Sequence, residues 1–257
     1  MSKKILLIIT LLVQLSFLAF NSYSFAAATS EGTIYIDWNS LSVSGIDVTW
    51  EYGYDWYSPA VQINSDDAVV TDGGNFGWEG IVDDTLIISG SYGKLYSDPD
   101  KIEASSFAVS NGSSVISAYS RAQIVRSGVF TANESGTLNI TVSFHFSGTV
   151  SSENLYDNSS IYYTTYLSFF DPNNIETKFD FDSYSDSFLI SDGEEDVANT
   201  DILCIQYVFT EGQTVEFWAS VYQLSNVTSS PVPIPGAVWL LGTGLVGLAG
   251  WRRKLKR

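Results

Sequence analysis

Cysteine and histidine are nearly absent from this chain of 257 residues, which contains only Cys204 and His145. One cysteine cannot close an internal disulfide, and one histidine excludes zinc sites built on two or three histidines. Cys204 lies within an apolar strand pattern, which predicts a buried, inert thiol, whereas the pattern around His145 places that side chain on a polar strand face. No Gly-x-Ser-x-Gly motif selects a serine nucleophile. We therefore expect no enzymatic activity and no cofactor, and keep an unrecognised extracellular hydrolase as a second alternative.

Basic residues are scarce between residues 29 and 230. All 29 acidic residues lie between Glu31 and Glu216, against only five lysines and arginines in that stretch. The other seven basic residues are at the two ends of the chain. So acidic a middle segment argues against nucleic acid as a partner, and basic ends around an acidic middle match the positive-inside arrangement of a membrane-inserted precursor.

Helix-forming patterns are also lacking in the middle segment, where Ser, Thr, Gly, Asn and Asp alternate with Tyr, Phe, Val and Ile. Residues 138–146 alternate strictly between apolar and polar, which is typical of a strand with one buried face. Similar patterns, with Gly128–Thr131 as a further edge strand, predict an all-β domain at residues 29–230, a β-sandwich or jelly-roll-like ectodomain. The predicted strands are 33–38, 46–56, 85–89, 115–125, 162–170, 202–210 and 214–224.

Two connections in this domain carry specific predictions. Glu211-Gly212-Gln213 separates two strand patterns and predicts a hairpin with a three-residue turn. The segment 171–201 is polar and acidic, and we expect either a long loop or a marginal hairpin there.

The first 28 residues have the three parts of a secretory signal peptide. Lys3 and Lys4 precede an apolar run from residue 5 to 20, and Ala26-Ala27-Ala28 offers a small-residue cleavage site. The alternative is an N-terminal transmembrane anchor, which the small-residue site disfavours. The order of these parts predicts export of the domain that follows.

The last 27 residues, 231–257, contain a second membrane signal. A proline motif at 231–235 precedes an apolar stretch at 236–251, and a basic tail at 252–257 ends the chain. Sixteen helical residues span about 24 Å, somewhat less than the ~30 Å hydrocarbon core, and the flanking tryptophans and basic side chains suit the interface. The stretch therefore predicts a short transmembrane helix whose basic end stays in the cytoplasm.

This order of proline motif, apolar helix and basic cluster resembles the PEP-CTERM sorting signal, in its variant with a Val-Pro-x-Pro motif. Ile234 and Gly236 depart from the residues usual at those positions. The resemblance implies a Gram-negative bacterial protein that an exosortase-like enzyme recognises, first anchored in the inner membrane and then placed at the cell surface or in an extracellular polysaccharide matrix. By the same resemblance the sorting motif comprises Pro233, Pro235, Gly236, Arg252, Arg253 and Lys254. An unprocessed proline-rich stalk is the alternative.

Aromatic residues are concentrated between residues 46 and 57. Strict alternation would place Trp50, Tyr52, Tyr54 and Trp56 on one face of a strand. Such a row can form a platform for sugar rings, or it can be the inner face of a sandwich, and the part near Tyr57 is the part we expect at the rim. These four residues are our candidate carbohydrate contact.

Acidic loops offer a candidate calcium site, with oxygen ligands from Asp180, Asp182 and Asp186. The spacing does not match an EF-hand, and a solvated acidic loop is the commoner explanation. Together these patterns predict an exported structural or adhesive matrix protein. The first alternative is a carbohydrate-binding module within an exopolysaccharide matrix.

Overall fold

The computed structural model describes residues 27–229, except 52–54, 65, 70–71, 75–80, 112–114, 116, 154 and 156, and it describes only the backbone at 55, 66–69, 72–74 and 175–177. All regular structure in these residues is β-strand. The described part holds no helix of the length and apolarity needed to cross a membrane. The predicted signal peptide, apart from its last two residues, and the predicted C-terminal helix lie outside the described residues.

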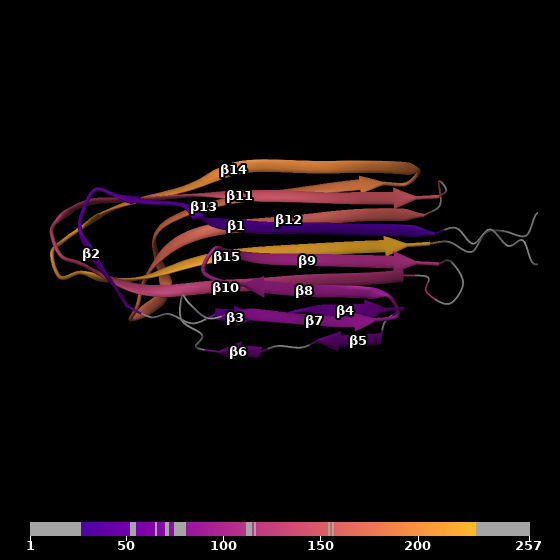
Figure 1. Cartoon of the computed structure of the whole chain (residues 1–257), viewed down its shortest axis with the longest axis horizontal. Helices are drawn as coiled ribbons and strands as arrows, with labels where there is room; N and C mark the ends of the chain where they lie inside the picture. The colour runs from indigo at the N-terminus through magenta and orange to yellow at the C-terminus, as the bar shows by residue number, and fades with distance from the viewer. Residues whose placement is uncertain are drawn as a thin grey trace, which may run out of the picture.

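Most of the strands are long and run side by side along the long axis of the molecule (Figure 1). In chain order they are β1 (Ala28–Ser44), β2 (Val48–Glu51), β3 (Asp55–Tyr57), β4 (Ala60–Ile63), β5 (Asp66–Val69), β6 (Asp72–Gly74), β7 (Val82–Ile88), β8 (Ser91–Ser97), β9 (Lys101–Ser110), β10 (Ser117–Ala132), β11 (Gly136–Ser152), β12 (Asn158–Asp171), β13 (Asn174–Ile190), β14 (Gly193–Phe209) and β15 (Thr214–Thr228).

The strands form two antiparallel sheets. Sheet A has the order β14-β11-β1-β9-β8-β7, and sheet B has the order β13-β12-β15-β10-β3-β6, with β2 and β4 also paired to β10 and β5 paired to β4. Alternation explains why the sheets pack face to face: in β11 the side chains from Leu138 to Phe144 are buried at every second position and partly exposed between. The predicted all-β class and sandwich arrangement are therefore confirmed for the described residues.

Aromatic and large aliphatic side chains fill one half of the interior. Phe130 of β10 contacts Phe169 and Phe209 at ring-centroid distances of 5.5 and 5.4 Å, both edge to face. Phe217 of β15 packs against Phe169 at 6.2 Å. These rings come from both sheets, so this half of the sandwich is held together by aromatic packing.

Small side chains line the other half, where both ends of the described chain lie. Ser106 of β9 donates to Ser225 of β15 at 2.8 Å, and Ser110 donates to Ser229 at 2.7 Å, so hydroxyl pairs bridge the two sheets. A Cβ built on Gly93 of β8 would lie 2.4 Å from the backbone carbonyl oxygen of Arg121. The sheets therefore approach more closely here than aromatic side chains would permit.

Three local predictions are wrong: those for Gly128–Thr131, for the turn at 211–213 and for the segment 171–201. Gly128–Thr131 is not a separate edge strand, because it continues β10, which has β15 on one side and β2, β3 and β4 on the other. The turn at 211–213 does not close a hairpin, because β14 belongs to sheet A and β15 to sheet B. Turn residues indicate where the chain reverses, but both hairpins and sheet-to-sheet connections use them.

The segment 171–201 is neither a long loop nor marginal structure, because it forms all of β13 and the first half of β14. β13 pairs with β12 along nearly its whole length. Its sequence looks like a loop because its position at the edge of sheet B allows serine and aspartate to alternate with Phe and Tyr. Tyr184 and Phe188 of this strand pack on the main core.

Candidate functional site

The predicted aromatic row between residues 46 and 57 is not one continuous face. β2 pairs with β10 so that Trp50 opposes Phe130, whereas β3 pairs so that Trp56 opposes Val125. The two pairings differ by one residue, and a one-residue shift moves side chains to the opposite face of a strand. Trp50 packs on Phe130 and Phe217 at 5.0 and 6.0 Å and is 37% exposed. Trp56 lies on the outer side of sheet B.

Tyr52 and Tyr54 lie outside the described residues. The structure therefore corrects the geometry of the predicted row, and any contact of its residues with sugar stays a prediction.

The outer face of sheet B presents aromatic side chains from four neighbouring strands. We call this surface the aromatic face, and its residues are Tyr119 of β10, Tyr162, Tyr166 and Phe170 of β12, Phe181 of β13, and Trp218 and Tyr222 of β15. Phe170 contacts Trp218 at 4.9 Å, Tyr166 contacts Phe181 at 5.9 Å, and Tyr162 contacts Tyr222 at 5.9 Å. The rings therefore form three contacting pairs on one outward face.

Small serine side chains lie between the rings of the aromatic face. Ser168 lies directly across from Trp218, and Ser220 lies directly across from Tyr166. Both serines point outward, yet they are 0% and 1% exposed, and their hydroxyl groups have no hydrogen-bond partner. Large rings that lean over small neighbours account for this burial. The rings, not the serines, therefore form the outer surface at these positions.

Charge on the aromatic face differs from charge in the rest of the acidic body. Among the described outward side chains of β10, β12, β13 and β15, Glu216 is the single carboxylate, and it accepts a hydrogen bond from Trp218 Nε1 at 2.6 Å. The same positions carry two of the five basic residues of the body, Arg121 and Lys178. The Lys178 ammonium lies 4.4 Å from the Phe181 ring centroid. This surface therefore favours anionic or neutral partners.

One tyrosine hydroxyl of this surface, that of Tyr222, remains protonated over a wide pH range. Burial, followed by a hydrogen bond and charge interaction with Tyr119, raises the pKa of Tyr222 well above its ordinary value. Arg121 Nε is buried and has no hydrogen-bond partner. The face thus offers neutral hydroxyl donors beside a guanidinium group.

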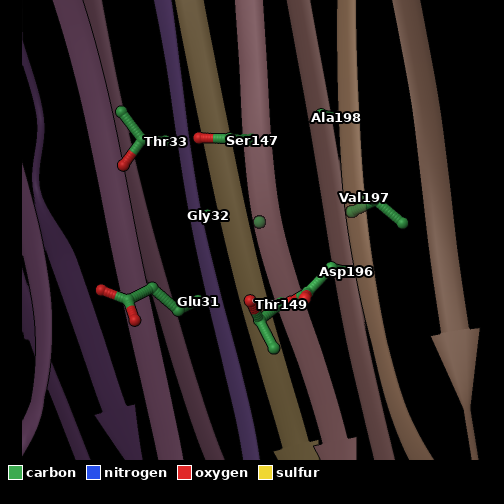
Figure 2. Close-up of a pocket in the computed structure, with 9 residues that line it drawn as sticks. Glu31, Gly32, Thr33, Ser147, Thr149, Asp196, Val197 and Ala198 are labelled. Atoms are coloured by element: carbon green, nitrogen blue, oxygen red, sulfur yellow. Dashed lines mark hydrogen bonds between the residues drawn. The ribbon is translucent and has the colours of Figure 1, made fainter.

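The outer face of sheet A has a different feature, a hollow of about 480 Å³ across β1, β11 and β14. We call it the trench. Thr33, Ser147 and Ala198 stand side by side on its three strands, in direct register (Figure 2). In the row between the outward rows, Gly32 and Gly148 are paired and face the interior, so only their backbone lines the trench. The trench exists because a row of small residues crosses the sheet between rows of larger ones.

One wall of the trench carries two carboxylates. Glu31 Oε1 accepts a hydrogen bond from the Tyr92 hydroxyl at 2.6 Å, and Asp196 Oδ1 accepts one from Thr149 at 2.7 Å. In the next outward row, beyond Thr33 and Ser147, Tyr35 and His145 form a stacked pair of rings with centroids 4.8 Å apart and planes at 24°, and we take this row as the opposite wall. No sequence pattern indicates this site, because its residues come from three strands far apart in the chain.

Cys204 and His145, the one cysteine and the one histidine that could form a nucleophile–base pair, lie apart. His145 is on the outer, polar face of β11 as predicted, with Nδ1 3.0 Å from Thr200 Oγ1. Cys204 is exposed, so the prediction of a buried thiol is wrong. β14 is an edge strand, and its outward positions meet solvent even though they are apolar: Ile202 is 61% exposed. Cys204 and His145 are four positions apart in the register, too far for a nucleophile and its base.

The candidate calcium ligands have other partners. Asp180 and Asp182 point from β13 towards β14, where each accepts a backbone hydrogen bond, and Asp186 accepts one from the amide of Ser187. Among the residues that the structure describes, no three His, Cys, Asp or Glu side chains gather in a way that would hold a metal ion. A calcium site at these residues stays a prediction, as does the sorting motif at Pro233, Pro235, Gly236, Arg252, Arg253 and Lys254, which lies outside the described residues.

No family model and no curated protein matches this chain. Solved structures with some likeness include the vicilin of hazelnut (Corylus avellana), 5% identical over 79% of this chain and 70% of that one, with a TM-score of 0.13. The 7S globulin of Momordica charantia is 6% identical over 77% and 70%, with a TM-score of 0.12. The C-terminal globular domain of the Pyrococcus abyssi oligosaccharyltransferase is 10% identical over 77% and 47%, also with a TM-score of 0.12. Likeness at this level carries no argument about fold or function.

Proposed function

We propose that this protein is an exported bacterial matrix protein with an adhesive role, which binds extracellular polysaccharide through the aromatic face of sheet B. The observation that carries the proposal is the chemistry of that face: contacting aromatic rings, tyrosine hydroxyls and two cations, with a single carboxylate among its described side chains, on a strongly acidic protein. An exosortase-like enzyme would sort the precursor by its C-terminal segment.

Each feature of the aromatic face suits a polysaccharide that carries acidic groups. The C–H faces of sugar rings stack on aromatic rings, as the indole of Trp218 and the phenol of Tyr166 would allow. Arg121 and Lys178 lie towards opposite ends of the face and supply charge for carboxylates on the chain. Trp56, on the adjoining β3, extends the aromatic surface and keeps one residue of the predicted row in the proposed contact.

The position of the chain ends suits attachment at a cell surface. Ala28 pairs with Ser110, and Ser110 bonds to Ser229, so the described chain begins and ends at the same end of the sandwich. Tethering through the segment after Ser229 would leave the aromatic face, which runs along the strands, open to the side. A matrix polymer could then lie along it without meeting the tether.

Electrophoresis of the mature domain, residues 29–230, through gels that contain polygalacturonate tests the proposal. We expect polygalacturonate to retard the wild-type protein, with Trp218→Ala and Tyr166→Ala each weakening binding about tenfold, the equivalent of ~1.4 kcal/mol. Arg121→Gln should weaken binding more at low salt than at 0.5 M salt, because salt screens exposed charges.

A matched control is Tyr35→Ala, which removes one aromatic ring from the opposite sheet. It should leave the retardation by polygalacturonate unchanged, and circular dichroism should show all variants folded. If the wild type migrates equally in gels with and without polygalacturonate, or if Tyr35→Ala weakens binding as much as Trp218→Ala, the aromatic face is not the contact.

A further inference from the structure

The trench on sheet A has the features of a second binding site, one that prefers a different ligand from the aromatic face. We propose that it binds a segment of a polysaccharide rich in hydrogen-bond donors, either a neutral hexose chain or an amino sugar chain, and that it rejects acidic chains. The inference goes beyond the proposed function because it concerns the opposite face of the molecule and other residues.

The shape of the trench suits a linear chain that crosses the strands. Its volume of about 480 Å³ is within the ~300–1,000 Å³ usual for ligand sites. Glu31 and Tyr35, on the two walls, are four positions apart on β1, which corresponds to about 13 Å between the wall rows. The row of small residues continues onto β9, where Ser105 Oγ lies 2.9 Å from Thr33 Oγ1. A single polysaccharide chain can therefore lie between the walls over several strands.

The hydrogen-bonding groups of the trench select donors on the ligand. The carboxylates of Glu31 and Asp196 can only accept when ionised, and the bonds from Tyr92 and Thr149 occupy one oxygen of each. Those bonds hold each carboxylate in place, so little order is lost when a ligand binds to the second oxygen. Sugar hydroxyls and ammonium groups are donors of this kind.

Tyr92 supports this arrangement over a wide pH range. Burial, followed by its hydrogen bond to Glu31, raises the pKa of the Tyr92 hydroxyl well above the ordinary value. Tyr92 therefore remains protonated, and a donor to Glu31, well above neutral pH. On the other wall, the stacked rings of Tyr35 and His145 offer an edge against which the C–H surface of a sugar can pack.

The acidic wall also gives the trench its specificity. A polyuronate would place carboxylates beside Glu31 and Asp196, and such like-charge contacts oppose binding. The aromatic face differs in its charge preference, because its cations favour an acidic polymer. If both sites act, which rests on the proposed function as well, one molecule would cross-link an acidic polymer to a neutral or amine-bearing polymer.

Titration calorimetry with three hexasaccharides tests the trench: cellohexaose as the neutral chain, the hexamer of glucosamine as the amine-bearing chain, and hexagalacturonate as the acidic chain. We expect at least one of the first two to bind, and we expect any binding of hexagalacturonate to be the same in the wild type and in Ala198→Trp, because it takes place on the aromatic face. Ala198→Trp, an exposed position on β14, would fill the trench and should abolish binding of the first two, while Trp218→Ala on the aromatic face should leave it unchanged.

Two further variants separate the neutral and amine sources. Glu31→Gln and Asp196→Asn remove charge but keep an acceptor, so they should weaken binding of the glucosamine hexamer at least tenfold and change cellohexaose binding less than threefold. The trench proposal is overturned if neither cellohexaose nor the glucosamine hexamer binds, or if Ala198→Trp binds them like the wild type. Retardation by polygalacturonate does not depend on these variants, so the two proposals can fail separately.

Discussion

Asp182 on β13 accepts a hydrogen bond from the backbone amide of Cys204 on β14, with 2.7 Å between the amide nitrogen and Oδ2. Asp180 accepts one from the amide of Gln206 in the same way, at 2.6 Å. β13 is an edge strand of sheet B and β14 an edge strand of sheet A. Two carboxylates therefore occupy edge amides that could otherwise pair with another chain, one of the devices by which proteins protect sheet edges.

Removing both carboxylates should expose the edge of β14. We expect the double variant Asp180→Ala/Asp182→Ala to lose about 2 kcal/mol of unfolding free energy, because two hydrogen bonds to charged acceptors disappear. It should also aggregate several times faster at 37 °C in a light-scattering assay. Glu194→Ala, which removes a carboxylate elsewhere on β14, is the matched control. Equal aggregation rates for the two variants would show that the aspartates do not protect this edge.

Close approach of the sheets at Gly93 gives a stability prediction. A Cβ there would meet the carbonyl oxygen of Arg121, and backbone cannot move aside as a side chain can. Gly93→Ala should therefore destabilise the domain by about 3 kcal/mol or more in urea denaturation. Gly193→Asn is the comparison, because Gly193 has φ of +92° with nothing near its Cβ position, so its cost is backbone strain without a clash and should be smaller. A loss below 1 kcal/mol for Gly93→Ala would mean that the sheets can separate locally without cost.

Asp98 gives a pH dependence with a definite sign. Burial acts to raise the pKa of Asp98, but hydrogen bonds from the Tyr96 hydroxyl and the amides of Lys101 and Asp100 outweigh it, so the pKa lies below its ordinary value. A lowered pKa in the folded state contributes stability above the unfolded pKa of about 4, and this contribution is lost as the pH falls through the folded value.

We therefore expect thermal unfolding midpoints to fall more steeply below pH 4 for the wild type than for Asp98→Asn, while both behave alike between pH 5 and 7. The two proteins should be compared at matched salt, from pH 2 to 7. Parallel curves below pH 4 would show that the carboxylate of Asp98 adds nothing to acid stability.

How far the sequence predicts this fold depends on whether a feature is local. Alternation at 138–146 predicted a strand with one buried face, and β11 has it, because each side chain's environment follows from its own position in the pleat. The strand pairings were not predictable in the same way. The turn at 211–213 looks like a hairpin, and only the competing partners of β14 and β15 show that the chain changes sheet there.

The candidate sites show the same limit. Trp50 and Trp56 alternate in the sequence as if they shared a face, but one extra residue between their pairings with β10 places them on opposite sides. The aromatic face comes from β10, β12, β13 and β15, whose outward residues are scattered over more than a hundred positions. Its composition is visible only when the register is known. The exposed Cys204 has the same cause, since an apolar strand pattern does not tell whether its strand is at an edge.

Processing at the two ends of the chain would determine where the proposed binding faces operate. If the resemblance to a sorting signal is correct, intact mass spectrometry of the protein from its native host should show a species that lacks the first 26–28 residues and everything beyond Pro235. That species should be enriched in the extracellular fraction, because removal of the apolar stretch at 236–251 removes the predicted membrane anchor.

Substituting both Pro233 and Pro235 by alanine should keep the full-length C-terminus and leave the protein in the membrane fraction. Exchanging Ser229 and Ser230 for alanine, just before the motif, is the control and should not change processing. A wild-type protein that retains residues 236–257 in every fraction would mean that the tail is a plain anchor. The aromatic face and the trench would then meet polysaccharide only within reach of the membrane, so any cross-linking would take place at the cell surface.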